Sequence, residues 1–237
     1  MKKILIACIG AAAFCGAPAL AADMAVKAPP PPVVATAYSW TGFYIGGDIG
    51  YGWGQSTGVL NDGIFNTSPV PYTADPKGII GGGYAGYNYE ISPFVVGVEA
   101  DWQAADVSGS GTGICCGGLS YTMNSKISSY SSLRGRLGFA QDRWLVFATG
   151  GWAWGDAKTS YSATGAAPFY TNKIDGSGAT VGAGFEYAVT NNWLARIEYR
   201  HTDFGSHGFE NLTPCACGEN GNRLTLNDIR LGAAYKF

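Results

Sequence analysis

The final stretch of the chain, Asn227–Phe237, alternates strictly between two chemical faces. Successive side chains of a β-strand point to opposite sides of the sheet. One face therefore carries Ile229, Leu231, Ala233, Tyr235 and Phe237, and the other carries Asp228, Arg230, Gly232, Ala234 and Lys236. A transmembrane β-strand pairs an apolar lipid-facing row with a polar lumen-facing row over about 9–11 residues. This stretch predicts the closing strand of a membrane barrel, one that runs to a terminal aromatic residue.

The composition agrees with a barrel rather than with a helical membrane protein. Charged residues make up 14% of the chain, against roughly 25% in ordinary soluble proteins. The mean hydropathy is only +0.03, because apolar residues that alternate with polar ones cancel in the average. No internal apolar run approaches the ~18 residues of a transmembrane helix. The net charge of −2 argues against a nucleic-acid partner.

The chain begins with a targeting segment. Lys2 and Lys3 precede the apolar run Ile4–Ala13, and Ala19-Leu20-Ala21 forms an A-x-A cleavage site. This order is typical of a secretory signal peptide, so residues 1–22 predict export. Residues 23–39 contain four consecutive prolines and predict an extended periplasmic leader. The barrel domain is expected to cover residues 40–237.

Seven further alternating segments precede the last one. They are Trp40–Trp53, Lys77–Glu90, Phe94–Gln103, Lys126–Ala140, Trp144–Trp154, Gly178–Val189 and Trp193–Asp203. The segment Trp144–Trp154 is apolar on both faces, so its orientation stays open. Four polar, Gly-rich connections are expected to be long loops: Gly54–Pro76, Ala104–Ser125, Gly155–Ser177 and Phe204–Asn222. Three tight turns are expected at Ile91-Ser92-Pro93, Gln141-Asp142-Arg143 and Thr190-Asn191-Asn192.

The connections alternate between long and short along the chain. Outer-membrane barrels have an even number of strands, long external loops and short periplasmic turns. The sequence therefore predicts an all-β fold: an eight-stranded antiparallel up-and-down transmembrane β-barrel with four long external loops and three short periplasmic turns. Aromatic residues near the strand ends predict interfacial girdles. One girdle is Trp40, Tyr89, Phe94, Trp144, Trp193 and Phe237, and the other is Trp53, Trp102, Trp154 and Phe204.

The inward row carries charges of both signs. An eight-stranded barrel is just wide enough for side chains to fill its interior, and unpaired charge is costly there. We therefore predict a lumen ion-pair network rather than paired carboxylates for general acid–base catalysis. Its members are Asp48, Glu99, Asp101, Arg134, Arg136, Glu186, Arg196, Glu198, Arg200, Asp228 and Arg230. Such a network argues against a wide pore and leaves a narrow or gated water path open.

The expected loops carry the remaining candidate chemistry. Four cysteines follow the signal peptide: Cys115, Cys116, Cys215 and Cys217. In an oxidising setting they predict loop-to-loop disulfides, with three pairings open. Metal capture by four thiols is the alternative, although neither CC nor CxC has the spacing of a zinc site. The two histidines, His201 and His207, are candidate haem ligands; no resident cofactor is expected.

Five segments carry a family resemblance: Ser39–Gly54, Gly78–Glu90, Leu133–Gly155, Val181–Gly205 and Asn227–Phe237. Together they resemble the small outer-membrane β-barrel family of alphaproteobacteria, the outer-membrane immunogenic or porin-family proteins with an OmpA-type barrel. The resemblance implies an abundant, surface-exposed and antigenic protein of the Gram-negative cell envelope, and some relatives are reported to bind haem. It brings no catalytic motif. The expected partners are outer-membrane lipid and lipopolysaccharide, together with the barrel-assembly machinery, which would read Tyr235 and Phe237 as a C-terminal assembly signal.

These observations support one leading function and leave others open. The leading hypothesis is a non-enzymatic structural protein integral to the cell outer membrane. A narrow porin-like channel for small solutes is the first alternative, and external loops that bind haem or a host ligand are the second. A barrel enzyme, such as a lipid-modifying acyltransferase or esterase, would have to use Ser132 with Arg134 or His201 with Asp203. No Ser/His/Asp arrangement of defined spacing supports it. The oligomeric state stays open.

Overall fold

The computed structural model describes residues 38–62, 70–115, 119–163, 168–212 and 217–237, all within one compact unit. They form nine strands: β1 (Gly42–Asp62), β2 (Val70–Ala74), β3 (Lys77–Ile91), β4 (Phe94–Cys115), β5 (Leu119–Gln141), β6 (Trp144–Ala163), β7 (Pro168–Ala188), β8 (Trp193–Leu212) and β9 (Cys217–Lys236). In this part of the chain no helix is long and apolar enough to span a membrane.

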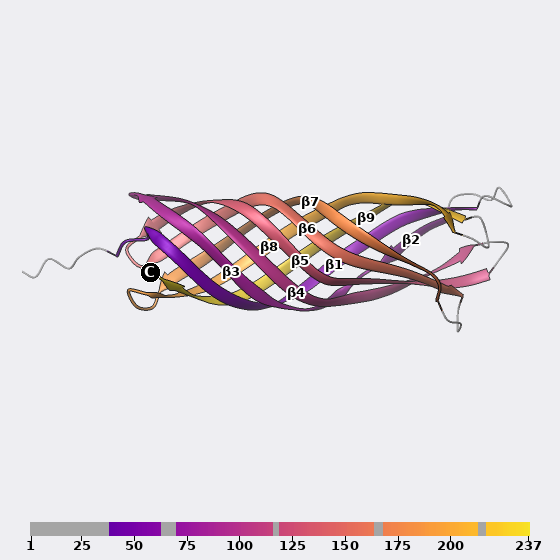
Figure 1. Cartoon of the computed structure of the whole chain (residues 1–237), viewed down its shortest axis with the longest axis horizontal. Coiled ribbons are helices and arrows are strands. Elements are labelled where there is room, and N and C mark those ends of the chain that lie inside the picture. The colour runs from indigo at the N-terminus through magenta and orange to yellow at the C-terminus, as the bar shows by residue number, and fades with distance from the viewer. Residues whose placement is uncertain (1–37, 63–69, 116–118, 164–167, 213–216) are drawn as a thin grey trace, which may run out of the picture. The chain divides into compact units, whose positions relative to one another are not determined.

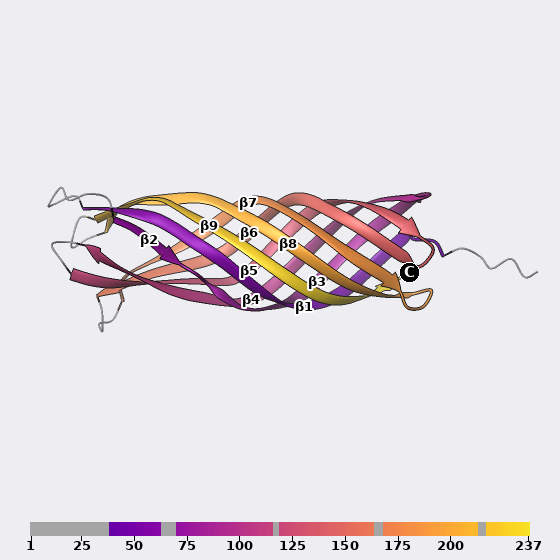
Figure 2. The same cartoon turned by 180° about the vertical axis from the view of Figure 1, so that it is seen from behind.

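The strands close into an antiparallel barrel. Their order is β2-β1-β3-β4-β5-β6-β7-β8-β9, and β1 also pairs with β9, so the two ends of the sheet meet (Figures 1 and 2). Strands β2 and β3 occupy one position in the barrel, because both pair with β1, at Ser56↔Ala74 and at Trp53↔Lys77. Pro76 lies between them and cannot donate a ladder hydrogen bond. Eight strand positions surround the lumen, which confirms the predicted eight-stranded barrel.

Alternation along each strand separates the two faces as predicted. On β9, Leu231 is 62% exposed on the outside and Arg230 only 2% exposed on the inside. The structure also settles the orientation of β6, which the sequence left open. Trp144 and Trp152 are exposed on its outer face, whereas Leu145 and Phe147 are buried in the lumen. Phe147 fits into the charged lumen because its ring lies against Arg136, with the guanidinium carbon 3.9 Å from the ring centroid.

The structure corrects the extents of the predicted loops. Segments expected to be loops are mostly continuations of the strands: β4 runs on to Cys115, and β5 already begins at Leu119. Their ladder continues through Gly109↔Ser125 and Thr112↔Thr122, after a register shift between Ala104 and Val107. A strand that projects beyond the lipid meets water, so it needs no apolar row. Its polar, Gly-rich sequence therefore resembles that of a loop although its backbone is paired.

The tight connections all join strands at one end of the barrel. Ser92-Pro93 joins β3 to β4, Asp142-Arg143 joins β5 to β6, and residues 189–192 join β7 to β8. Asp142 has a φ of 52°, a left-handed conformation that Asp tolerates better than most residues. The chain also ends here, and we call this the turn end. The opposite end, to which the long hairpins extend, is the hairpin end (Figure 1).

Two of the residues predicted for the aromatic girdles are not in them. Trp144 and Trp193 are more than half exposed on the outer face, and Trp102 and Trp154 are similarly exposed toward the hairpin end. Trp40 and Phe204, by contrast, are 0% and 2% exposed inside the barrel, so their assignment to girdles was wrong. Phe204 continues the inward row of Arg200 and Thr202, which strict alternation would have indicated. Trp40 precedes β1, which begins at Gly42 rather than at Trp40.

Candidate functional site: the filled lumen

Glu99 lies at the centre of the lumen network. Its carboxylate accepts hydrogen bonds from Arg134 and Arg196, and from the Tyr44 hydroxyl at 2.8 Å. Arg134 also donates to Glu198 on the opposite wall. The side chains of Glu99, Arg134 and Glu198 are at most 1% exposed. Three strands, β4, β5 and β8, are therefore joined across the barrel by charge-assisted hydrogen bonds, which are stronger than neutral ones.

Toward the turn end the network continues through Glu186. Its two carboxylate oxygens accept from Arg136 at 2.5 Å and from Arg196 at 2.6 Å. An aromatic ring lies against each guanidinium group. The Phe147 centroid is 3.9 Å from the guanidinium carbon of Arg136, and the Tyr84 centroid is 4.2 Å from that of Arg196. Cation–π contacts of this kind gain strength when water is excluded. This layer of the lumen is packed with side chains rather than open.

Toward the hairpin end the network passes to three aspartates. Asp101 accepts from Arg200 at 3.0 Å, and Asp228 accepts from Arg230 Nε at 2.5 Å. Asp48 lies 3.7 Å from Arg230, and Arg230 in turn lies 3.8 Å from Asp101. The structure thus brings all the residues of the predicted network into one connected set of ion pairs.

Sequence reasoning missed the neutral partners of this network. Tyr130 accepts a hydrogen bond from Arg230 and donates to Asp228 at 3.2 Å. Arg134 donates to the Thr149 hydroxyl at 3.1 Å, and Gln103 donates to Asp48 at 3.3 Å. Each of these side chains occupies an inward position of its strand. The parity that identified the charged residues would therefore have identified Tyr130 and Gln103, but not Thr149, because the sequence left the orientation of its strand open.

Apolar side chains pack at both ends of the charged layer. The turn-end cluster comprises Tyr38, Trp40, Tyr44, Tyr84, Val95, Ala140, Leu145, Phe147, Ala188, Leu194 and Ala234. The hairpin-end cluster comprises Ile80, Val107, Ile127, Tyr130, Ala153, Ala157, Phe204, Leu224 and Leu226, with Ala105 packed against it. The ion pairs therefore lie between two apolar layers that limit access of water from either mouth.

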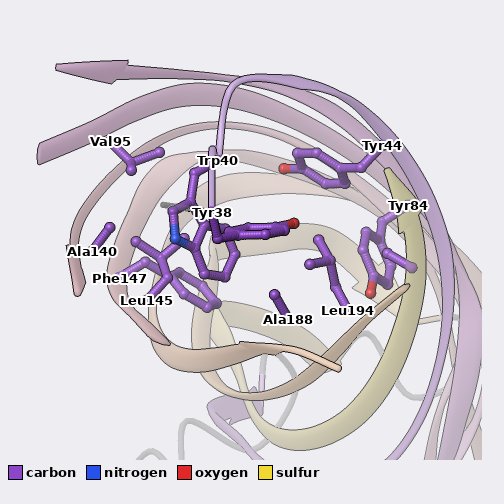
Figure 3. Packing of buried hydrophobic residues seen from close by; sticks show 11 residues of the cluster. Tyr38, Trp40, Tyr44, Tyr84, Val95, Ala140, Leu145, Phe147, Ala188 and Leu194 are labelled. Carbon is purple, nitrogen blue, oxygen red and sulfur yellow. The ribbon is translucent and has the colours of Figure 1, made fainter. Parts of the chain in front are cut away.

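The turn-end cluster is completed by residues that precede the first strand. Figure 3 shows Tyr38 and Trp40 projecting into the space that the strands enclose. Trp40 donates its backbone N–H to Glu90 at 2.8 Å and its indole N–H to the Asp142 carbonyl at 3.0 Å. Lys236 donates to the Ser39 carbonyl. Burial raises the pKa of the Tyr38 phenol to about 12, so Tyr38 stays neutral throughout the physiological pH range.

The indole hydrogen bond of Trp40 offers a modest test of this closure. Trp40→Phe keeps most of the apolar volume but leaves the Asp142 carbonyl without its donor, so we expect it to lower the free energy of unfolding by about 1 kcal/mol. Trp144→Phe is the matched control, because Trp144 is 51% exposed on the outer face. Denaturant unfolding of both variants in detergent checks the difference. Equal effects would show that the Trp40 hydrogen bond contributes no stability.

The other candidate residues lie apart from the lumen. His201 is on the outer face, where its Nδ1 lies 2.8 Å from the Asn227 side-chain oxygen. The side chain of His207 and those of Cys115, Cys116, Cys215 and Cys217 fall outside the described residues, so haem ligation and disulfide pairing remain predictions. Tyr235 and Phe237 are on the outer face at the turn end, with ring centroids 5.2 Å apart.

The proposed catalytic pairings are not assembled as such. Ser132 donates its hydroxyl hydrogen to Asp101 inside the lumen, whereas His201 lies on the outer face. Asp203 accepts from Arg223 at 2.5 Å and, among the described contacts, has no hydrogen bond to His201. Each lumen carboxylate of the network is within 4 Å of an arginine nitrogen. The arrangement holds charge in place and leaves no free base beside a nucleophile in the described part of the lumen.

Comparisons with known proteins agree with this architecture. A family model described as an outer membrane protein beta-barrel domain matches residues 7–237. The chain is 35% identical to the 31 kDa outer-membrane immunogenic protein of Brucella melitensis, over the full length of both. It is 33% identical to the 22 kDa outer membrane protein of Rhizobium leguminosarum bv. viciae, over 86% of this chain and 81% of that one.

Solved structures with a similar chain course include Neisserial surface protein A and the outer membrane protein OprG. Neisserial surface protein A is 15% identical, with a TM-score of 0.44, over 83% of this chain and 98% of that one. OprG of Pseudomonas aeruginosa is 13% identical, with a TM-score of 0.48, over 83% of this chain and 96% of that one.

Proposed function

Because this chain belongs to the outer membrane protein beta-barrel family, we propose that it is a structural surface protein with a closed, non-conducting lumen and no enzymatic activity. The barrel lies in the outer membrane. In such barrels the short turns face the periplasm and the longer connections face outward. The turn end is therefore periplasmic, and the hairpin end extends from the cell surface.

One observation carries the proposal: side chains fill the part of the lumen that the structure describes. Arg134, Arg200 and Arg230, each at most 2% exposed, occupy its middle. Trp40, at 0% exposure, closes the periplasmic end, and Phe204 packs with the apolar residues of the external end. A solute that crossed the barrel would have to separate several buried ion pairs, at a cost of several kcal/mol for each charge left unpaired.

The filled lumen also supports the absence of a catalytic role. Catalysis requires groups whose protonation or nucleophilicity is available to a substrate. The lumen carboxylates are each paired with arginine, and His201 lies outside the barrel wall bonded to Asn227. What remains accessible is the outer surface, which fits a protein that contacts lipid, the envelope and the surroundings of the cell. The relatives named as immunogenic are consistent with such exposure.

Single-channel recording in a planar lipid bilayer tests the proposal. We expect the folded chain to produce no conductance steps above the lipid baseline. The preparation must first show a heat-dependent mobility shift on a semi-native gel and sheet-rich circular dichroism, which establish that the barrel is folded. A known porin in the same bilayer supplies the positive control. Reproducible steps from the folded barrel would instead favour the narrow-channel alternative.

Two further expectations, on barrel assembly and on haem binding, follow from the orientation of the barrel in the membrane. We infer that the barrel-assembly machinery recognises the outward-facing aromatics Tyr235 and Phe237 during insertion. Haem capture through His201 and His207 remains the binding alternative. A haem titration of the wild-type chain and of the double variant His201→Ala/His207→Ala distinguishes it, since equal binding would exclude both residues as ligands.

A further inference from the structure

A row of lysines crosses the outer wall of the barrel beyond the external aromatic girdle. Lys126 on β5 lies directly opposite Lys158 on β6, and both are exposed on the outer face. The row extends toward β3, because Ser108 on β4 lies between Lys126 and Lys77, which is also exposed. Like charges placed opposite each other on neighbouring strands are destabilising. Such a row needs an anion to offset its repulsion.

The chain itself supplies only part of that compensation. Lys126 pairs with Asp106 at 2.9 Å, an ion pair in which both side chains are more than half exposed. Exposed pairs of this kind contribute little. Within the described residues no ion pair to Lys158 is formed, and the nearby Asp156 carboxylate lies 3.2 Å from the Ser129 hydroxyl. Lys158 is exposed on the outer face, where its ammonium group can meet an external anion.

The lysines line a polar depression of about 600 Å³ in the outer wall. Its other lining residues are small and rich in hydroxyl or amide groups: Ser108, Gly109, Ser110, Asn124, Ser125, Ser160 and Thr171. Hydroxyl and amide groups beside two ammonium groups are suited to hydrogen-bond a sugar phosphate. The size of the depression is comparable to that of sites that enclose small ligands.

A second depression lies on the same strands, closer to the membrane. It has a volume of about 280 Å³ and lies between Trp102 and Trp154, which flank Ser131 in the ladder. Serine side chains and Asp156 also line it. Lys158 follows Trp154 by four positions on β6, which is roughly 13 Å at ~3.3 Å per strand residue. Interfacial tryptophans sit at the level of the lipid head groups. An amphiphile could therefore place its apolar part at the tryptophans and its anion at the lysines.

We propose that this face of β4–β7, defined by Trp102, Trp154, Lys126 and Lys158, binds the phosphorylated sugar head group of lipopolysaccharide in the outer leaflet. The inference rests on the proposed function only in its orientation, with the hairpin end outside the cell. Its evidence is the juxtaposition of an aromatic depression at head-group level and a cationic, hydroxyl-lined depression just beyond it. A phosphate there neutralises the facing lysines without any rearrangement of the sheet.

Titration of labelled lipopolysaccharide into the folded chain in detergent tests this site. The double variant Lys126→Gln/Lys158→Gln should bind roughly twenty- to thirtyfold more weakly, because each lysine near an anionic lipid surface contributes about a fivefold step in affinity. Arg223→Gln is the control, since it removes one exposed positive charge on β9, outside the site. We expect it to change the affinity less than twofold. Chemically dephosphorylated lipopolysaccharide should bind both proteins equally.

Several results would overturn the assignment. Unchanged affinity in the double variant would exclude the lysine pair, and an equal loss in Arg223→Gln would mean that net charge alone matters. Inorganic phosphate or a sulfated polysaccharide that bound through the same lysines, without lipopolysaccharide binding, would identify a different anion. The heat-dependent mobility shift confirms that each variant is folded. Conductance is recorded separately, so failure of this site leaves the closed-barrel proposal standing.

Discussion

Replacing Glu99 by Gln is expected to lower the free energy of unfolding by about 3–5 kcal/mol. The substitution keeps the shape of the side chain but removes the negative charge shared by Arg134 and Arg196. Both guanidinium groups remain buried. Each keeps another carboxylate, Glu198 for Arg134 and Glu186 for Arg196, but each loses one charged partner that offsets its desolvation cost. Denaturant-induced unfolding of the barrel in detergent or lipid vesicles measures the loss.

Two control variants test whether the loss of stability arises from the burial of the ion pair. Asp106→Asn breaks an exposed ion pair with Lys126 and should cost less than about 1 kcal/mol. The double variant Glu99→Gln/Arg134→Gln removes both charges of a buried pair. It should lose less stability than the sum of the single variants, by at least about 1 kcal/mol, as expected for directly coupled residues. Additive losses would indicate that the Glu99–Arg134 contact is not formed in the folded barrel.

Gly50→Ala is expected to destabilise the barrel by about 2–3 kcal/mol through overpacking. A Cβ at this inward position would lie 2.3 Å from the Ile229 carbonyl oxygen and 2.8 Å from Cγ of Arg230. The first contact is with backbone, which cannot move without disturbing the β1–β9 ladder. The second is with the side chain that holds Asp228. The Arg230 side chain thus already occupies the space beside Gly50, and no room remains for a methyl group.

Gly150→Ala is the matched control for the effect of a methyl group on this sheet. Gly150 lies on β6, faces outward, and would place its Cβ with no heavy atom within 4 Å. Glycine in a strand loses more conformational entropy on folding than alanine, so this change should be neutral or slightly stabilising. Unfolding midpoints of the two variants, compared in the same detergent, check the contrast. A similar loss in both would point to a general effect of replacing glycine in the sheet rather than to crowding in the lumen.

The lumen network links strands around the barrel. The ion pairs are buried between apolar layers, and each arginine contacts groups on at least one other strand. A buried network of this kind is not by itself evidence of a large net stability, because desolvation offsets much of the attraction. It does fix the relative positions of the strands, since any shift leaves charges unpaired.

The sequence by itself determined the strand periodicity, the number of strand positions, the tight turns and the set of charged residues that faces inward. All of these follow from a local property: a pleated backbone sends alternate side chains to opposite faces, and lipid requires one face to be apolar. The same parity places Phe204 and Tyr130 inside, although neither residue is charged. The apolar inner face of β6 could not be recognised, because its two faces do not differ in polarity.

Only the tertiary structure decided the extents of the strands, the position of Trp40 and the register of the lysines, because local periodicity does not determine contacts between distant residues. It showed that polar segments expected to be loops extend the strands, because paired backbone outside the lipid needs no apolar face. It placed Trp40 in the periplasmic mouth, held by Glu90 and the Asp142 carbonyl from strands and turns distant in sequence. It also aligned Lys126 with Lys158 across two strands. Each of these depends on register and on closure of β1 against β9, which are set by contacts between residues far apart in the chain.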